Sequence, residues 1–203
     1  MARPVGDTRA ALLEAAIDVI EESGESGFRI DAVLERVGVA STAIYHHFGS
    51  RDDLIDSANA ERYLRTLYVL NHEQLVERIA SCRSKAEFAE ILDAQFALSR
   101  SPAAIARRRT RVSVLGSAVS RPTLAAKVNE ANATYARDMA AVFRVTQERG
   151  WMPPEVDIEA LAMWQIGQTT GRLMVELGDP PCDLDAWADV EATAIRAVMI
   201  APD

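Results

Sequence analysis

GVASTAIYHHFGSRDDL, residues 38–54, decides the fold, because it has the pattern of a helix end, a turn, a short second helix and the start of a third. Gly38 supplies the permissive backbone that the turn requires. In the short helix, which begins near Ser41, Ile44 and Phe48 stand four residues apart and are expected to pack inward. The residues that then face outward or lie at the edges are Ser41, Thr42, Tyr45 and His46. The stretch therefore predicts a helix-turn-helix.

Helical patterns continue on both sides of this stretch. Upstream, apolar residues at helical spacing predict a helix from about Asp7 to Ser23. Downstream, Ser50 and Asp53 have the spacing of a capping box at the start of a helix that is expected to run from Arg51 to about Leu70. The chain is expected to end with two helices, over 156–177 and 183–200.

Composition also favours helices. The chain has 203 residues and 49% hydrophobic residues, and its glycines and prolines fall between apolar stretches rather than within strand-like alternation. We expect an all-α fold with two domains, a helix-turn-helix domain over 1–50 and a helical domain over 51–203. Cys82 and Cys182 form no paired motif, and no leader or long apolar span is present. These features predict a cytoplasmic protein without a membrane span.

The charge balance opposes general affinity for nucleic acid. The net charge is −8, and residues 1–60 contain five arginines and eleven acidic residues, which give −6. Because attraction to phosphate depends on the cations presented, any DNA contact must be local. Glu21, Glu22 and Glu25 lie near the end of the first predicted helix, where they are expected to face away from a bound duplex.

The segment from Arg9 to Leu54 resembles the tetracycline-repressor (TetR) family. The resemblance is carried by the helix LLEAAIDVIEESG, the Gly-Val turn, Tyr45-x-His47-Phe48, and a basic residue followed by acids and Leu54. It implies an all-α dimeric transcription regulator of about nine helices. A three-helix DNA-binding domain is followed by a domain that binds a small effector and dimerises, and no cofactor is implied.

The resemblance also assigns the DNA-binding residues. Ser41 and Thr42 open the recognition helix and are expected at base edges, and Tyr45 at backbone, base or both. The remaining expected contacts, mostly to phosphate, are Arg29, His46, His47 and Arg51. Ala40 departs from the family, where serine is frequent, and Ser41 is expected to replace it as the helix cap. Asp31 is not counted as a contact, since its carboxylate can accept a hydrogen bond from cytosine but repels nearby phosphate.

Each of these features has a simpler alternative. A polar outer face on a short helix is often only solvated, and Tyr45 can instead pack against the first helix. His46 and His47 invite a metal-site interpretation, but adjacent helical residues point about 100° apart. We therefore expect no metal.

The second domain is expected to hold an apolar or amphipathic effector. A pocket between helices needs apolar walls and a few polar groups. The residues that offer this chemistry are Tyr68, Phe96, Arg109, Tyr135, Met139, Phe143, Trp164, Gln165 and Thr169. The basic run 107–111 is most simply a solvated face, although one arginine turned inward would neutralise an acidic ligand.

The last two predicted helices resemble the dimer surface of the family, because small and apolar residues share their faces. The expected interface residues are Ala160, Gly167, Gly171, Leu184, Trp187, Ala188, Ile195 and Val198. If these faces pack only within one chain, the protein is a monomer. A single recognition helix with so few cations binds DNA weakly, and this favours a homodimer.

Together these features predict a repressor that binds double-stranded operator DNA and leaves it when a small effector binds. Two alternatives stay open. One is a DNA-binding dimer without small-molecule sensing. The other is an all-helical enzyme, against which stands the lack of a metal, phosphate-loop or nucleophile motif.

Overall fold

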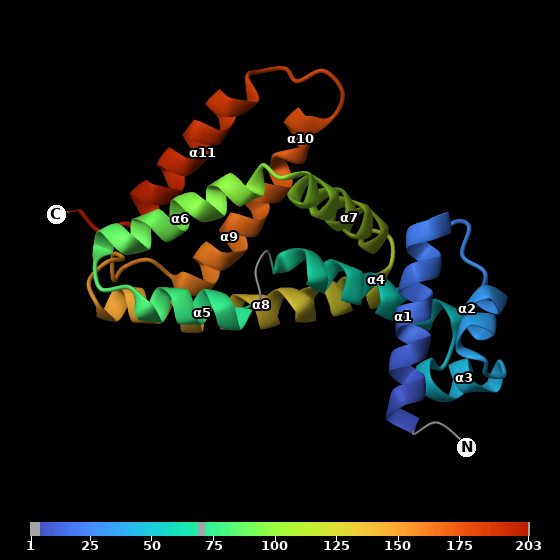
Figure 1. Ribbon diagram of the computed structural model, residues 1–203. Coiled ribbons are helices and arrows are strands. Elements are labelled where there is room, and N and C mark those ends of the chain that lie inside the picture. The colour runs from blue at the N-terminus through green and yellow to red at the C-terminus, as the bar shows by residue number, and fades with distance from the viewer. Residues whose placement is uncertain (1–4, 69–71, 203) are drawn as a thin grey trace. The chain divides into compact units, whose positions relative to one another are not determined.

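The computed structural model describes residues 5–68 and 72–202, and these residues form α-helices and no β-strand (Figure 1). The predicted all-α class is confirmed. The helices are α1 (Val5–Ser23), α2 (Ile30–Val37), α3 (Thr42–Phe48), α4 (Arg51–Leu67), α5 (His72–Ser81), α6 (Lys85–Ser99), α7 (Pro102–Ala118), α8 (Pro122–Glu148), α9 (Ile158–Gly171), α10 (Leu173–Glu176) and α11 (Leu184–Met199). None of these helices is both long and apolar enough to cross a bilayer.

The described residues group into two compact units. The first contains residues up to Arg65 together with 114–129, and the second contains 66–113 together with residues from 130 onward. The first unit is thus larger than the 1–50 domain expected from the sequence. The chain passes between the units at three points, and each of them falls inside a helix, so α4, α7 and α8 each contribute residues to both units.

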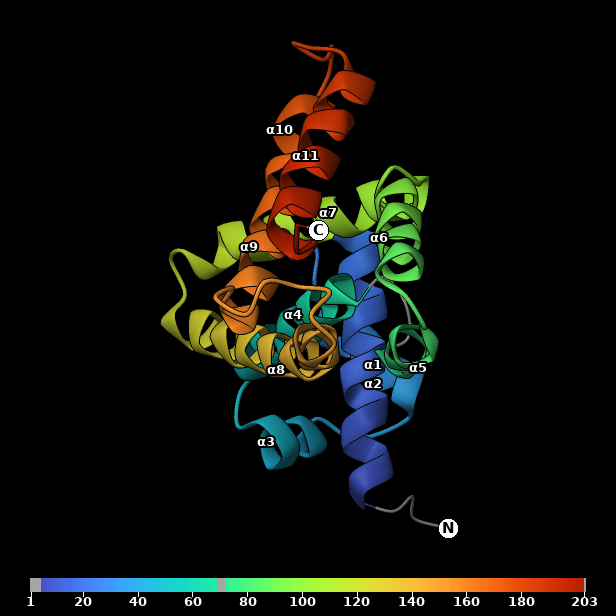
Figure 2. The same cartoon turned by 90° about the vertical axis from the view of Figure 1, so that its left-hand side faces the viewer.

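The first unit has its own apolar core. Helix α1 packs against α2 and α3 (Figure 2), and its buried side chains meet Val33 of α2, Ile44 of α3 and Leu54 of α4. Ile44 has no exposed surface. Burial of an isoleucine side chain contributes about 1.5–3 kcal/mol, so this residue holds the short α3 on the core.

The turn and the two helix starts follow the sequence patterns. Gly38 lies in the left-handed region (φ 72°, ψ 37°) and its N–H donates to the Leu34 carbonyl at 2.8 Å, which confirms the predicted turn. Ser50 Oγ accepts a hydrogen bond from the Asp53 N–H at 3.0 Å, and it donates to Asp53 Oδ2 at 2.7 Å. The predicted capping box is confirmed. The Asp53 carboxylate accepts its bond from the Ser50 hydroxyl, whereas in the usual capping box it accepts from the backbone N–H of the cap residue.

We expect Ser50→Ala to lower the free energy of unfolding of the first unit by about 1 kcal/mol, because one N–H at the start of α4 loses its acceptor. Urea unfolding followed by circular dichroism measures the change. Glu35→Ala is the control, since Glu35 is exposed inside α2 of the same unit and alanine favours a helix interior. A Ser50→Ala protein as stable as the control contradicts the capping role.

Two predicted helices end differently in the structure. Helix α4 ends at Leu67, whereas the sequence predicted about Leu70, and residues 69–71 lie outside the described residues. The predicted helix over 156–177 is divided into α9 and α10 at Arg172. The Val175 N–H donates to the Arg172 carbonyl three residues earlier, at 3.1 Å, and this tighter turn interrupts the α-helix.

Candidate functional site

Helix α3 presents a polar face away from the core. Ile44 is buried and Phe48 is partly buried, which confirms the predicted inward side. Thr42, Tyr45 and His46 are exposed, with 61% of Tyr45 accessible to solvent. Tyr45 is therefore largely accessible to a partner.

Ser41 precedes α3 at the N-cap position, but its side chain makes no capping hydrogen bond. The expectation that Ser41 replaces a serine cap at Ala40 is wrong in this respect. An N-cap side chain reaches the first turn from an extended backbone, whereas Ser41 is already helical (φ −56°, ψ −30°). Ser41 is exposed and remains a candidate contact at the start of the face.

The cationic candidates lie on the same unit. Arg29 is exposed at the N-terminus of α2, and His47 is half-buried with its ring edge-to-face against His46 at 4.9 Å between centroids. Arg51 donates to the Phe28 carbonyl at 3.1 Å and to Asp52 Oδ1 at 3.2 Å, and its guanidinium lies over the Phe28 ring. The contacts of Arg51 thus place it beside the loop that carries Arg29.

Several acidic residues of the first unit form ion pairs with arginines of α2 and α4. Glu22 forms an ion pair with Arg36 of α2, which lowers the pKa of Glu22 by a direct hydrogen bond. Glu14 pairs in the same way with Arg65, and Glu21 lies 3.7 Å from Arg62. These acids therefore have arginine partners on α2 and α4, and the α3 face keeps its neutral and basic side chains.

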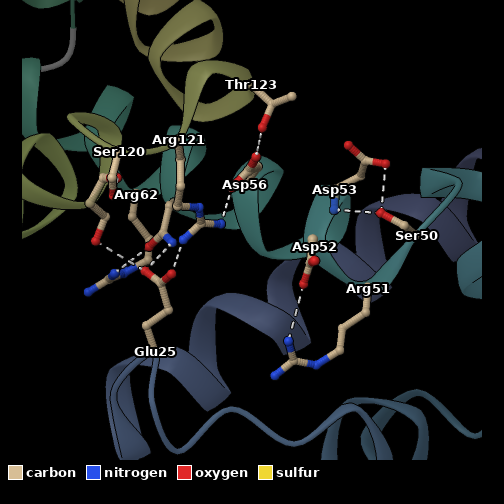
Figure 3. A network of polar contacts seen from close by, with 12 residues as sticks. Glu25, Ser50, Arg51, Asp52, Asp53, Asp56, Arg62, Ser120, Arg121 and Thr123 are labelled. Carbon is tan, nitrogen blue, oxygen red and sulfur yellow. Dashed lines mark hydrogen bonds and ion pairs between the residues drawn. The ribbon is translucent and has the colours of Figure 1, made fainter.

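A second polar cluster lies within the first unit (Figure 3). Arg121, in the turn between α7 and α8, pairs through its two Nη atoms with Glu25 and with the buried Asp56 of α4. The Thr123 hydroxyl donates to the same Asp56 carboxylate, and Asn59 donates to Glu25 at 2.9 Å. This cluster joins the α1–α2 loop and α4 to the α7–α8 turn. Sequence reasoning missed it because its members are far apart in the chain.

The second unit contains a cavity of about 150 Å³. Its lining comes from the end of α4, from the segment directly after α4, and from α5, α6, α7, α8, α9 and α11. Of the nine residues expected to bind an effector, those that line this cavity are Tyr68, Phe96, Tyr135, Met139, Phe143, Gln165 and Thr169.

The structure places Arg109 and Trp164 outside this cavity, and the expectation for these two residues is wrong. Arg109 is exposed, whereas Arg108 and Arg111 are buried at 2% and 4% exposure. Successive residues of a helix point about 100° apart, so Arg109 faces away from its two neighbours. Trp164 is exposed on α9, where Gly167 is also exposed.

The two buried arginines of the basic run have different surroundings. Arg108 donates to Glu176 and to the Ser99 carbonyl, and Arg172 pairs with both Glu176 and Glu191. Burial raises the pKa of Glu191. Arg111 instead lines the cavity and donates to hydroxyls of Thr residues 66, 169 and 170. Arg108 is thus part of a buried ionic cluster, and Arg111 belongs to the cavity.

The expected dimer surface is only partly exposed. Ala160 and Gly167 of α9 are exposed, and the partly buried members are Gly171, Leu184, Trp187, Ala188 and Val198. Ile195 is buried at 2% and lines the cavity, so its assignment to the interface is wrong. Helical periodicity alone did not distinguish the two sides of α11. The large exposed apolar residues of this region, which sequence reasoning did not place at the interface, are Trp164, Met174, Leu177 and Val190.

Among residues 5–68 and 72–202, no group of three or more His, Cys, Asp or Glu side chains is placed to hold a metal ion.

Comparisons with known proteins agree with this arrangement. Residues 12–58 match the family model described as bacterial regulatory proteins, tetR family. The chain is similar to the HTH-type transcriptional regulator BetI of Paraburkholderia phymatum, with 28% identity over 92 residues, which cover 45% of each protein. It is also similar to the HTH-type transcriptional regulator UidR of Escherichia coli K12, with 22% identity over 185 residues, 91% of this chain and 82% of UidR. A solved transcriptional regulator from Saccharomonospora viridis in complex with choline shares the fold, with a TM-score of 0.62 and 19% identity over 97% of this chain and 100% of that one.

Proposed function

Because this chain belongs to the TetR family of DNA-binding transcriptional regulators, we propose that it is a ligand-responsive repressor. In this proposal a homodimer binds operator DNA and leaves it when a small apolar or amphipathic effector occupies the cavity of the second unit. The single observation that carries the proposal is the exposed polar face of α3, held on its core by the fully buried Ile44.

The α3 face has the side chains that a major groove requires. Hydroxyls at positions 41 and 42 can bond base edges, and Tyr45 offers a phenol to base or backbone. Arg29, His46, His47 and Arg51 supply the donors for phosphate. In a homodimer, two copies of α3 enter successive major grooves about 34–36 Å apart.

Helix α4 is the proposed connection between effector and DNA. It begins at Arg51, a candidate DNA contact, and it ends at Leu67, which lines the cavity. A ligand shifts the operator affinity only if it binds one state better than the other. An effector that changes the end of α4 acts on the same helix that carries Arg51. The two states that the effector distinguishes therefore also differ at a candidate DNA contact.

We also infer that the dimer forms through α9, α10 and α11. Trp164, Met174, Leu177 and Val190 are exposed apolar residues on or next to these helices, and exposed apolar patches mark interaction sites. Ala160 and Gly167 add small residues that permit close helix approach. A dimer that binds chromosomal DNA acts in the cytoplasm.

The two alternatives make different predictions. A DNA-binding dimer without sensing needs no cavity, whereas the second unit has one of about 150 Å³, and this favours sensing. The relatives named above are transcriptional regulators, which supports a regulatory over a catalytic role. Turnover of a substrate by the purified protein, lost on changing a cavity residue, would favour the enzyme.

Selection of genomic DNA fragments by the purified protein tests the proposal. We expect enrichment of an inverted repeat whose half-sites are one helical turn apart, bound by a particle with the mass of a dimer in light scattering. Val190→Glu places a charge on the exposed apolar face of each protomer, so it should give monomers with much weaker operator binding. Selection that yields no common sequence would argue against operator recognition, and a Val190→Glu dimer would argue against this interface.

A further inference from the structure

The walls of the cavity in the second unit fit a single aromatic ring. The rings of Tyr68 and Tyr135 meet edge-to-face with centroids 5.3 Å apart, and Phe96 and Phe143 also line the space. Aromatic rings pack favourably against the edges and faces of other rings. An engineered apolar cavity of about 150 Å³ holds benzene, and this cavity has about that volume. A compact ring compound therefore matches both the size and the walls.

One polar side chain of the cavity is a hydrogen-bond donor without an acceptor in the described part of the chain. Gln95 Nε2 is buried and has no hydrogen-bond partner among the described residues. A buried amide without a partner costs about 1–3 kcal/mol, so it indicates an acceptor that binds there. Ser99 and Thr169 also line the cavity, but their hydroxyls already donate to carbonyls of their own helices. The group that completes the hydrogen bonding at Gln95 must therefore be an acceptor.

The charge of the cavity points to an acid. Among the described residues that line it, Arg111 is the one charged side chain, and no Asp or Glu lines it. Burial raises the pKa of Tyr135 to about 12, although the nearby Arg111 lowers it. Tyr135 is therefore a neutral phenol at physiological pH. A cationic ligand would be repelled by the guanidinium, whereas a carboxylate forms charge-assisted hydrogen bonds with it.

We propose that the effector is a compact aromatic carboxylic acid. Its carboxylate binds Arg111 and Gln95, and its ring fills the apolar part of the cavity. This inference rests on the proposed function, because it names the chemical class of the effector that occupies the same cavity.

The same arginine connects the acid to the regulation. Arg111 Nη2 donates to the Thr66 carbonyl at 2.6 Å, and Nε donates to the Thr66 hydroxyl at 3.2 Å. Thr66 is in the last turn of α4, where carbonyls lack partners within the helix. A carboxylate that binds the guanidinium competes with these bonds. The acid therefore acts on the end of α4, the helix proposed to connect effector and DNA.

Calorimetry on the 203-residue protein without DNA tests the class of ligand with three probes of one ring each. Benzoate is the acid, benzamide is its neutral analogue of similar shape, and benzyltrimethylammonium is the cation. We expect benzoate to bind at least about tenfold more tightly than benzamide, because charge-assisted bonds are stronger than neutral ones. We expect no binding of the cation. Benzamide binding as tight as benzoate, tighter binding of the cation, or no benzoate binding at millimolar concentration overturns the proposal.

Variants test the two residues separately. Arg111→Met should weaken benzoate binding at least about thirtyfold and abolish the preference over benzamide, whereas Arg111→Lys keeps the charge and should keep the preference. Gln95→Leu should weaken the binding of benzoate and of benzamide about fivefold. This variant keeps Arg111, so it still tests the site if Arg111→Met does not fold. Arg109→Met is the matched control, since Arg109 is exposed two residues away on the same helix. Equal losses in the Arg109 and Arg111 variants overturn the assignment.

The outcome separates this inference from the proposed function. If benzoate binds as expected but leaves operator affinity unchanged, the acid site stands and the repressor mechanism fails. If a cation or a neutral compound releases the operator while benzoate does not bind, the repressor mechanism stands and the acid site fails.

Discussion

Simultaneous replacement of Tyr45 and Arg51 by alanine should lower operator affinity at least about 100-fold. Tyr45 is 61% exposed, so its loss removes no core contact, and a good base contact contributes about 1–3 kcal/mol. Arg51 adds a proposed phosphate contact. Both changes act twice in a dimer, and a 100-fold loss corresponds to about 2.7 kcal/mol. Fluorescence anisotropy with the selected operator measures the affinity.

Two further measurements show whether the loss of affinity comes from the proposed DNA contacts. One is the salt dependence of binding, and the other is a matched control variant. The loss of one phosphate contact per protomer should lower the slope of log affinity against log salt concentration by about 2 in a dimer. Arg144→Ala removes an exposed arginine from α8 and should leave affinity within about twofold. If the Tyr45/Arg51 double variant binds within threefold of the unmodified protein, the α3 face is not the recognition surface.

Replacement of Arg121 by alanine should destabilise the first unit by about 3 kcal/mol. Asp56, whose side chain is 3% exposed, then loses its ionic partner and keeps the bond from Thr123. Removal of one partner from a buried ion pair costs about 3–5 kcal/mol, and we take the low end because the Arg121 side chain is 25% exposed. All three tryptophans lie at 151, 164 and 187, in the second unit. Tryptophan fluorescence therefore reports on the second unit. The stability of the first unit is measured by hydrogen exchange of the α1 and α3 amides.

A second change distinguishes charge from packing at this site. Asp56→Asn in the Arg121→Ala background removes the unpaired buried charge, so the double variant should be more stable than Arg121→Ala alone. Glu25→Gln should cost less than about 1 kcal/mol, since the Glu25 side chain is 34% exposed. If the Asp56→Asn change adds a further loss instead, the Arg121 effect comes from packing and not from the carboxylate.

The features that the sequence predicted well depend on short-range patterns. Ile44 and Phe48 are four residues apart, Gly38 ends α2, and Ser50 caps α4, and each of these depends on neighbours within one or two helical turns. Most of the predicted cavity residues also line the cavity, because aromatic side chains on packed helices face inward. Local periodicity is sufficient for these assignments.

The features that the sequence did not predict depend on contacts between distant segments. Arg121 is 96 residues from Glu25 and 65 residues from Asp56, so no local pattern joins them. Arg109 and Arg111 have the same chemistry, and only the packing of α7 determines which of them is buried. Ile195 belongs to the cavity for the same reason, because both sides of α11 carry apolar residues and the sequence alone does not assign either one.

The contacts of Arg51 have a consequence for the thermodynamics of binding. A free arginine side chain carries about 2 kcal/mol of rotamer entropy, and a contact that immobilises it loses part of the binding energy. Here the guanidinium already rests on the Phe28 ring, 5.3 Å from its centroid, and bonds the Phe28 carbonyl. The side chain is preorganised before the duplex arrives, so this contact forms with a smaller entropic loss than a freely rotating arginine would incur.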